Sequence, residues 1–291
     1  MMTGKLYPWA KACTLKAGMG FLQLYEPDKL SELRHCLQTV GQIPLLLGRG
    51  SNLVGSDSTS PIPVLRLAKG ADFGTILALS ENCFRVGCAL NLAELLSTLA
   101  ARGYGGLAGL SGIPGSLGGA LAMNAGANGQ EISAAVEQVD GWDLQHDRPW
   151  QWRKEEGGWA YRQSPIPSGV IVLHAILRFQ KIAPSTETSQ IAAERKRREK
   201  ATPAGASAGS VFRNPAPEQP AGRLLEQAGC KGLSAGAFSV SVQHANWIVN
   251  CSRTPGKAED CRRLVNEMQQ KVHEKFAVDL HCEWRWADEI L

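Results

Sequence analysis

A run of small residues from Gly105 to Gly129 constrains this 291-residue chain more than any other stretch. Most of its residues are Gly, Ala or Ser, it carries no charge, and Ile113 is its one β-branched residue. Glycine permits positive φ and close backbone approach to a ligand, and successive exposed N–H groups form an anion-binding concavity. A flexible linker is the alternative. Pro114, Leu117 and Asn124 favour a shaped loop, so we interpret it as the wall of a phosphate-bearing cofactor site.

Composition restricts the class of protein. The length suggests about two domains, and 44% hydrophobic with 20% charged residues is typical of an ordered globular chain. The formal net charge of +4 is too diffuse to indicate nucleic acid, although it could favour a small anionic substrate. No apolar run approaches the ~18 residues that a membrane span needs, and residues 1–20 lack the apolar core of a signal peptide.

The eight cysteines contain no C-x-x-C pair, which favours structural thiols of a reducing cytoplasm over disulfides or a metal. The six histidines show no metal-ligand spacing. We therefore expect a cytoplasmic protein without a metal site, without nucleic-acid or membrane partners, and monomeric.

A second glycine turn follows a short apolar strand at 43–47 and reads Gly48-Arg49-Gly50-Ser51-Asn52-Leu53. A strand entering such a turn presents N–H groups to a phosphate. The dinucleotide fingerprint G-x-G-x-x-G would open a helix; here Leu53 replaces the third glycine and residues 54–57 are not helical, so that fold is rejected. An ordinary tight turn is the alternative.

Periodicity predicts mixed helices and strands in both halves. Helices are expected from Pro27 to Val40, from Asn91 to Gly103 with Asn91 as the N-cap and Glu94 at N3, and at 191–200, 221–228 and 255–275. Strands are expected at 62–67, 82–88, 136–144, 170–179, 211–212 and 237–250. The last strand, 278–285, alternates apolar with polar residues, with His281 and Glu283 on its polar face.

Eight motifs together resemble the UDP-N-acetylenolpyruvoylglucosamine reductase family, and they occur in that family's order from about residue 14 to 286. Any one is weak, but the ordered set is specific, and the spacing from Tyr161 to Ser210 resembles the shorter subclass that lacks a tyrosine-bearing loop. The motifs are residues 48–53, 111–120, 123–127, 161–164, 208–215, 228–232, 244–250 and 276–283.

The resemblance implies an α+β fold: a two-subdomain FAD-binding domain of the PCMH/vanillyl-alcohol-oxidase type, followed by an α/β substrate-binding domain. The expected boundaries are 1–67 and 68–181 for the two FAD-binding subdomains, 182–200 for a linker and charged helix, and 201–291 for the substrate-binding domain, whose last strand carries Glu283.

The resemblance also implies the chemistry. NADPH would reduce FAD, and flavin N5 would then pass hydride to the methylene carbon of UDP-N-acetylglucosamine enolpyruvate, giving UDP-N-acetylmuramate for peptidoglycan synthesis and hence for cell-wall biogenesis, cell shape and cell division. Ser210 would protonate the carbon that bears the carboxylate. Arg162 and Glu283 would stabilise that carboxylate as it gains enolate character.

Further residues are implied as binding groups. Substrate contacts are expected from Asn214, Lys200 and Arg198, and Lys200, Arg198 and Lys231 are candidates to stabilise the Ser210 alkoxide. We expect Gly50, Gly118 and Gly119 to leave no room for a Cβ between backbone and cofactor. The full expected FAD set is Gly48, Arg49, Gly50, Ser51, Asn52, Leu53, Ser111, Gly112, Ile113, Gly115, Gly118, Gly119, Asn124, Ala125 and Gly126.

The chain departs from the family pattern at three places: a weakened segment at 14–21, an altered stretch at 197–203, and His281 where an acid is usual. Two other functions stay open. A flavin oxidase acting on an alcohol would share both glycine loops but would not need the 208–215 and 276–283 motifs. A non-enzymatic flavin-containing or apo relative is disfavoured by the presence of Arg162, Ser210 and Glu283.

Overall fold

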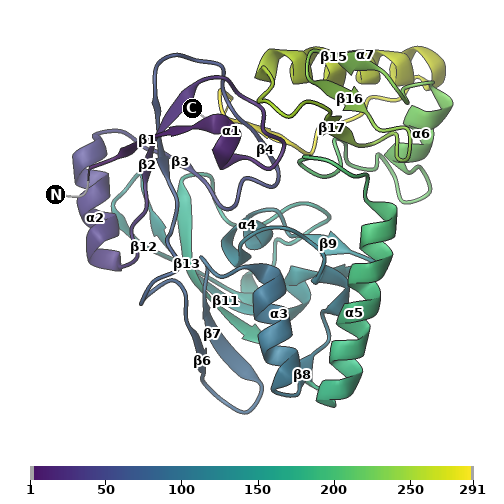
Figure 1. Ribbon diagram of the computed structural model, residues 1–291. Helices are drawn as coiled ribbons and strands as arrows, with labels where there is room; N and C mark the ends of the chain where they lie inside the picture. The colour runs from purple at the N-terminus through teal and green to yellow at the C-terminus, as the bar shows by residue number, and fades with distance from the viewer. Residues whose placement is uncertain (1–2, 290–291) are drawn as a thin grey trace. The chain divides into compact units, whose positions relative to one another are not determined.

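The computed structural model describes residues 3–289 and divides the chain into two compact units whose segments alternate along the sequence (Figure 1). Unit 1 contains Tyr25–Gly48 and Val64–Glu199. Unit 2 contains Gly4–Leu24, Arg49–Pro63 and the described residues from Lys200 onward. Within the turn at 48–53, Gly48 therefore belongs to unit 1 and residues 49–53 belong to unit 2.

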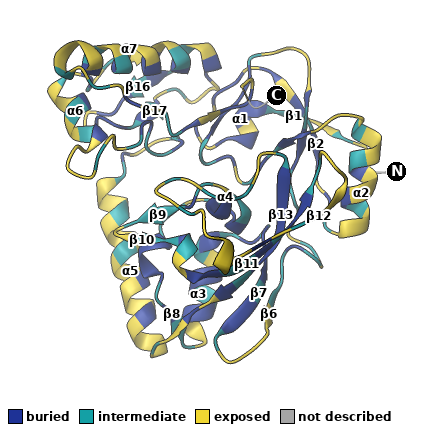
Figure 2. Ribbon diagram, turned by 180° about the vertical axis from the view of Figure 1, so that it is seen from behind, coloured by how far each residue is buried: buried dark blue, intermediate teal, exposed yellow. Residues whose placement is uncertain are grey.

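A five-stranded antiparallel sheet forms the centre of unit 1, in the order β12-β11-β13-β7-β6. The middle strand β13 is buried without interruption from Val170 to Ala175, as Figure 2 shows. Both of its faces are covered, which explains why its sequence is apolar apart from His174. The strands span Arg148–Arg153 (β12), Val136–Asp143 (β11), Val170–Arg178 (β13), Cys83–Gly87 (β7) and Ile76–Ala78 (β6).

Helices of unit 1 cover the two faces of this sheet. Ile171 and Leu173 share a core cluster with α2 (Leu30–Val40), whereas Val172 and Leu177 share another with α3 (Leu92–Ala101) and α4 (Leu117–Ala122). The helix α5 (Pro184–Ala201), which leaves unit 1 after Glu199, runs beside α3 (Figure 1), where Arg195 donates to the Ser97 hydroxyl at 2.8 Å.

The N-termini of α3 and α2 are stabilised differently, one by a side chain of the adjoining residue and the other by a side chain distant in sequence. The predicted cap of α3 is confirmed, because the Asn91 side chain accepts from the N–H groups of Ala93 and Glu94. The helix expected from Pro27 begins instead at Leu30, whose N–H donates to the Asp72 carboxylate at 2.9 Å.

The glycine run is structured rather than a continuous loop. It contains a 3-10 turn at Ala108–Leu110, the helix α4, and a hairpin of β9 (Gly126–Ala127) and β10 (Gln130–Glu131) whose turn holds Asn128 and Gly129 at positive φ. The other short elements in or crossing into unit 1 are β3 (Leu45–Leu46), β5 (Ile62–Leu65), β8 (Tyr104–Gly105), β14 (Gln180–Lys181) and two 3-10 turns, Ile132–Ala135 and Lys154–Glu156.

Unit 2 packs α7 (Ala258–Phe276) and α6 (Ala221–Gln227) with the antiparallel sheet of β15 (Ser234–Ala235), β16 (Phe238–Val240) and β17 (Ile248–Asn250). The apolar stripe predicted for α7 is confirmed, and Figure 2 separates its buried face from its exposed one. The buried stripe is Cys261, Leu264, Val265, Met268 and Val272.

N-terminal segments complete the core of unit 2. Leu15, Ala17 and Val54 share a cluster with Trp284 and Trp286. The N-terminal elements are β1 (Lys5–Pro8), α1 (Trp9–Ala12) and β2 (Phe21–Tyr25), with β1 antiparallel to β2; β4 (Leu53–Val54) runs parallel to β18 (Arg285–Trp286).

The strand predicted at 278–285 is much shorter than expected, because only Arg285–Trp286 forms a strand. The residues before it are extended and joined to the chain at 211–213 by an isolated bridge between Phe212 and Cys282. Glu283 thus lies just before β18. The expected alternation in burial is still present.

All eight cysteines are free thiols. Within residues 3–289, no helix is long and apolar enough to cross a membrane. The same part of the chain contains no cluster of His, Cys, Asp or Glu suited to a metal ion.

Candidate functional site

In unit 1 the first residue of the 48–53 glycine turn lies against the start of α4. A Cβ on Gly48 would lie 2.8 Å from the Ser116 hydroxyl and 3.8 Å from Gly119 Cα. Ser116 is the N-cap of α4, and its hydroxyl accepts from the Gly119 N–H at 3.3 Å. Gly48 and the start of α4, which belong to the two segments expected to bind the cofactor, are therefore neighbours.

The loop before α4 retains unused polar groups. The Ser111 hydroxyl is buried and has no hydrogen-bond partner within residues 3–289. In the same described range, the N–H groups of Gly112, Gly115 and Ser116 have no protein acceptor. Unsatisfied donors at a glycine-rich helix start fit an anionic ligand. These residues therefore suit the pyrophosphate of a dinucleotide cofactor.

The three glycines expected to face the cofactor differ. A Cβ on Gly50 would lie 1.9 Å from the Ala12 carbonyl oxygen, and one on Gly118 would lie 3.3 Å from Cys88 Cβ. Packing against protein thus excludes a side chain on Gly50, whereas one on Gly118 would need Cys88 to shift by a few tenths of an ångström. Contact of these two glycines with cofactor stays a prediction. A Cβ on Gly119 would meet nothing closer than the Ser116 hydroxyl at 3.5 Å. Only this glycine borders space that a ligand can fill.

Asn124 is fully buried and adopts a φ of +42°. Its side-chain nitrogen donates to Glu131 at 2.9 Å and to the Ala160 carbonyl at 2.8 Å, and its oxygen accepts from Ser133 N at 3.3 Å. Although it was expected to bind cofactor, its side chain holds the turn that carries Arg162. Contact of Asn124 with cofactor stays a prediction.

Arg162 and Arg198 form a cationic pair in unit 1. Arg162 has a φ of +56°, and its guanidinium donates to the Gly126 carbonyl at 2.9 Å and lies over the Tyr161 ring. The Arg198 side chain covers Gly112, where an added Cβ would lie 2.5 Å from Arg198 Cδ. Burial, and then repulsion from Arg197 and Arg162, lowers the pKa of Arg198. Like charges placed close enough to repel one another, one of them on a partly desolvated Arg198, favour binding of an anion.

In unit 2, Ser210 and Glu283 lie on neighbouring extended segments. Ser210 forms a bridge with Trp247. The Glu283 N–H donates to the Val211 carbonyl at 2.7 Å, and the Arg213 N–H donates to the His281 carbonyl at 3.0 Å. The serine and the glutamate are both partly buried. A hydroxyl and a carboxylate are thus held at adjacent positions of one small ladder.

The second part of the glycine turn also reaches Glu283. The Asn52 side-chain nitrogen donates to the Glu283 carbonyl at 2.9 Å, and the Asn52 carbonyl accepts from Arg285 N at 3.0 Å. Asn52 was expected to bind cofactor, and its hydrogen bonds connect the 48–53 turn to the segment that carries Glu283. Arg49, Ser51 and Leu53 lie in the same unit, where Leu53 pairs with Arg285 in the short parallel ladder.

The expected substrate-binding residues fall in different surroundings. The Asn214 side chain accepts from Ala221 N at 3.0 Å and so caps α6. Lys200 is exposed, and its carbonyl accepts from the Gln243 amide at 2.8 Å. Lys231 pairs with Glu226 at 2.6 Å, which makes it a poor candidate to stabilise an alkoxide at Ser210.

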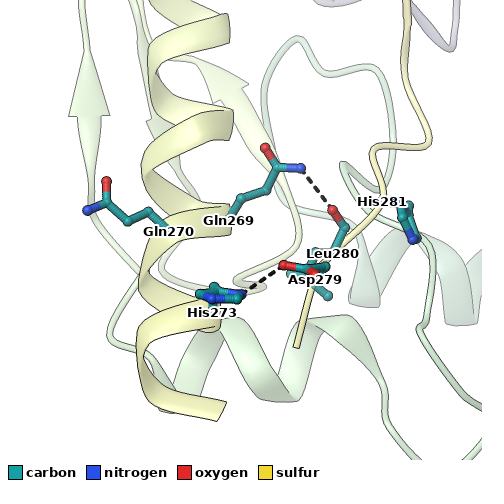
Figure 3. Close-up of a pocket in the computed structure, with 6 residues that line it drawn as sticks. All are labelled: Gln269, Gln270, His273, Asp279, Leu280 and His281. Atoms are coloured by element: carbon teal, nitrogen blue, oxygen red, sulfur yellow. Dashed lines mark hydrogen bonds and ion pairs between the residues drawn. The ribbon is translucent and has the colours of Figure 1, made fainter. Parts of the chain in front are cut away.

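A shallow pocket between α7 and the segment that follows it lies beside this ladder (Figure 3). His273 bonds Asp279 at 2.8 Å, and Gln269 donates to the Leu280 carbonyl at 2.8 Å. His281 lines the pocket but lies apart from this pair, as Figure 3 shows. None of the residues expected to bind FAD or to act in catalysis lines it.

Comparison with known proteins identifies the class. Residues 22–146 match an FAD binding domain family, and residues 200–287 match the C-terminal domain of UDP-N-acetylenolpyruvoylglucosamine reductase. The first range contains both glycine segments, and the second contains the Ser210–Glu283 ladder. The chain is an FAD-binding flavoprotein with an α+β fold and a separate C-terminal domain.

Full-length relatives identify the family. UDP-N-acetylenolpyruvoylglucosamine reductase of Bacillus subtilis is 31% identical, covering 95% of this chain and 91% of its own. The Thermus thermophilus protein of that name is 35% identical, with coverages of 93% and 94%. The crystal structure of the Thermus caldophilus reductase matches with a TM-score of 0.82 at 33% identity, covering 98% of this chain and 99% of its own. The chain belongs to the UDP-N-acetylenolpyruvoylglucosamine reductase family.

Sequence reasoning missed several residues that organise the site. The connecting role of Asn52 and the bonds of the buried Asn246 depend on contacts between distant segments. The Ser116 cap is local, since its hydroxyl accepts from Gly119 N three residues on. The signal for Asn246 was present, since it falls in the 244–250 motif and is a polar residue in an apolar stretch.

Proposed function

We propose that this chain reduces UDP-N-acetylglucosamine enolpyruvate to UDP-N-acetylmuramate with NADPH, through bound FAD, in peptidoglycan precursor synthesis. Membership of the reductase family supports the substrate and the reductant. A cytoplasmic location and a monomeric state remain predictions from the sequence.

FAD would be held by the two glycine segments. Ser111, Gly112 and Gly115 offer free polar groups near the start of α4, and Gly119 leaves space for the cofactor. When bound, the flavin accepts hydride from NADPH and supplies it to the methylene carbon of the enol ether. The protein's own contribution is to orient the substrate and to supply a proton.

Ser210 would donate a proton to the carbon that bears the carboxylate, and Arg162 and Glu283 would stabilise the carboxylate as negative charge develops on it. Hydrogen bonding by a guanidinium and an acid is stronger to the enolate-like state than to the ground state, so it lowers the barrier. Arg198, Lys200 and Asn214 are proposed to bind substrate, with Arg198 the best supported because it shares a cationic region with Arg162.

The observation that carries the proposal is the 2.7 Å bond from Glu283 N to the Val211 carbonyl, which holds Glu283 beside the Ser210 segment. An alcohol oxidase has no need of this pairing of a hydroxyl with a carboxylate.

The test is anaerobic oxidation of NADPH by the purified yellow protein, with and without UDP-N-acetylglucosamine enolpyruvate. We expect oxidation of one NADPH per substrate and formation of UDP-N-acetylmuramate. Reoxidation of the reduced flavin by oxygen but not by the enolpyruvyl substrate would indicate an oxidase. A colourless protein that takes up no FAD would indicate an apo relative.

A further inference from the structure

Asn246 is buried to 4% exposure and binds the backbone of the segment that follows Ser210. Its side-chain oxygen accepts from Phe212 N at 2.9 Å, and its side-chain nitrogen donates to the Phe212 carbonyl at 2.8 Å. Its own carbonyl accepts from Val211 N at 2.9 Å. One asparagine therefore satisfies three of the four backbone polar groups of residues 211 and 212.

The fourth group, the Val211 carbonyl, accepts from Glu283 N. All four backbone polar groups of residues 211 and 212, which follow Ser210 in the chain, are thus bonded by either Asn246 or Glu283. A primary amide fits this task because it offers a donor and an acceptor on one planar group, matched to the N–H and C=O of one residue. Removing it would leave two buried backbone groups unpaired, at a cost of about 1–3 kcal/mol each.

We propose that Asn246 is a positioning residue for proton transfer from Ser210, acting through the backbone of Val211 and Phe212. The inference rests on the proposed function, because it presumes that Ser210 supplies the proton. Asn246 does not act on the substrate itself. Its side chain fixes the rotation of the peptide groups after Ser210, and this sets the direction of the hydroxyl and its spacing from Glu283.

Asn250 provides a matched control in the same unit. It is 6% exposed, and its side-chain nitrogen donates to the carbonyls of Leu15 and Thr254 while its oxygen accepts from Ser252 N. Its burial and hydrogen bonding resemble those of Asn246, but it holds a different segment. Loss of stability alone should therefore affect both variants alike.

The experiment compares Asn246→Ala, Asn250→Ala and the parent as FAD-loaded enzymes in rapid mixing. Reduction of the flavin by NADPH should stay within about twofold in all three. Reoxidation by the enolpyruvyl substrate should slow roughly 10²-fold in Asn246→Ala only, the size expected when a reacting group is displaced by about 1 Å. Equal rates of reoxidation in Asn246→Ala and the parent would overturn the proposal, as would equal slowing in the Asn250→Ala control.

A double-mutant cycle separates this inference from the proposed function. In a Ser210→Ala background, Asn246→Ala should slow reoxidation no further, because the group that it positions is gone. If Ser210→Ala alone leaves reoxidation unchanged, the assignment of Ser210 is wrong. If Ser210→Ala slows reoxidation and Asn246→Ala adds a separate, multiplicative loss, the positioning role is wrong.

Asn246→Asp keeps the test valid if the alanine variant does not fold. A carboxylate retains the acceptor for Phe212 N but faces the Phe212 carbonyl without a donor, whereas the protonated acid restores the donor. Reoxidation by Asn246→Asp should therefore become faster relative to the parent as pH falls. A ratio that does not change with pH would contradict the proposal.

Discussion

Glu283 donates its backbone N–H to the Val211 carbonyl over 2.7 Å, and its own carbonyl accepts from the Asn52 side chain over 2.9 Å. Both backbone polar groups of the proposed acid are thus fixed, one by the segment of the proposed proton donor and the other by the glycine turn.

Ser210→Ala should leave reduction of the flavin by NADPH near normal, since no proton from Ser210 enters that step. Reoxidation by substrate should slow by ~10²–10⁴-fold, the usual effect of removing a positioned general acid. Ser210→Cys should recover part of the rate, because a thiol of similar size is also a proton donor. Rapid mixing of pre-reduced enzyme with substrate measures this, and reoxidation at the parental rate in Ser210→Ala would make the serine only a turn residue.

Glu283→Gln should likewise slow the substrate half-reaction strongly while sparing reduction by NADPH. The backbone bonds to Val211 and Asn52 survive this change, so lost activity would report on the carboxylate itself. His281→Ala is the control: it is an exposed neighbour two residues away, and we expect a smaller effect. Equal slowing of both half-reactions in Glu283→Gln would count against its role.

Gly119→Val should abolish binding of FAD and leave the chain folded, because the space beside Gly119 is not filled by protein. Gly50→Val should instead destabilise the fold, since a Cβ there would collide with the Ala12 carbonyl and φ is +65°. The visible absorbance of bound flavin and the thermal unfolding of the apoprotein distinguish the two variants. Full flavin occupancy in Gly119→Val would show that FAD does not bind against α4.

Asp57→Ala should lower the free energy of unfolding by about 1–2 kcal/mol, the usual loss for a helix cap. The Asp57 carboxylate accepts from Ala258 N at 3.0 Å and Glu259 N at 3.1 Å at the start of α7, and from Met19 N at 2.8 Å. Asp57→Asn, which keeps one acceptor oxygen, should lose less. Denaturant titration of both variants checks this, and an unchanged midpoint would exclude the capping role.

Acid should destabilise unit 1 through His174. Burial lowers the pKa of His174 below its usual 6.5; the ring contacts Arg85 at 3.0 Å and the Asp72 carbonyl at 2.7 Å. The unfolded chain then binds the proton more readily, so stability is fully present above about pH 6.5 and declines as pH falls below it. The stability of the His174→Gln variant should decline less than that of the parent as pH falls. Burial also lowers the pKa of His244. The contribution of His174 is therefore the difference in pH dependence between the parent and His174→Gln.

Periodic segments were the most predictable. The helices α3 and α7 were predicted because apolar residues recur at helical spacing, and β13 because its sequence is mostly apolar. The helix α4 was missed, since Gly, Ala and Leu at 117–122 give no amphipathic pattern and a glycine-rich sequence resembles a loop. The strand at 278–285 was overestimated because alternation predicts an extended chain but not its hydrogen-bond partners.

The motifs nominated site residues, but they did not predict which segments hold them in place. Ser210, Glu283 and Arg162 were selected through ordered motifs. That Gly50 packs on Ala12, or that Asp57 caps a helix 200 positions away, depends on pairings that no local pattern encodes. Asn124 shows the same limit, because its motif gave no sign that its side chain bonds Glu131, Ser133 and Ala160.

The joining of Leu15 and Val54 to Trp284 and Trp286 in one core has a consequence for synthesis on the ribosome. The first segments of unit 2 emerge early, but their partners emerge only when nearly all of the chain has been made. Unit 1 is largely a continuous stretch and can condense first. Until release of the C-terminal residues, the early apolar segments lack their native partners, so nascent chains should need protection there and refolding should be limited by this long-range closure.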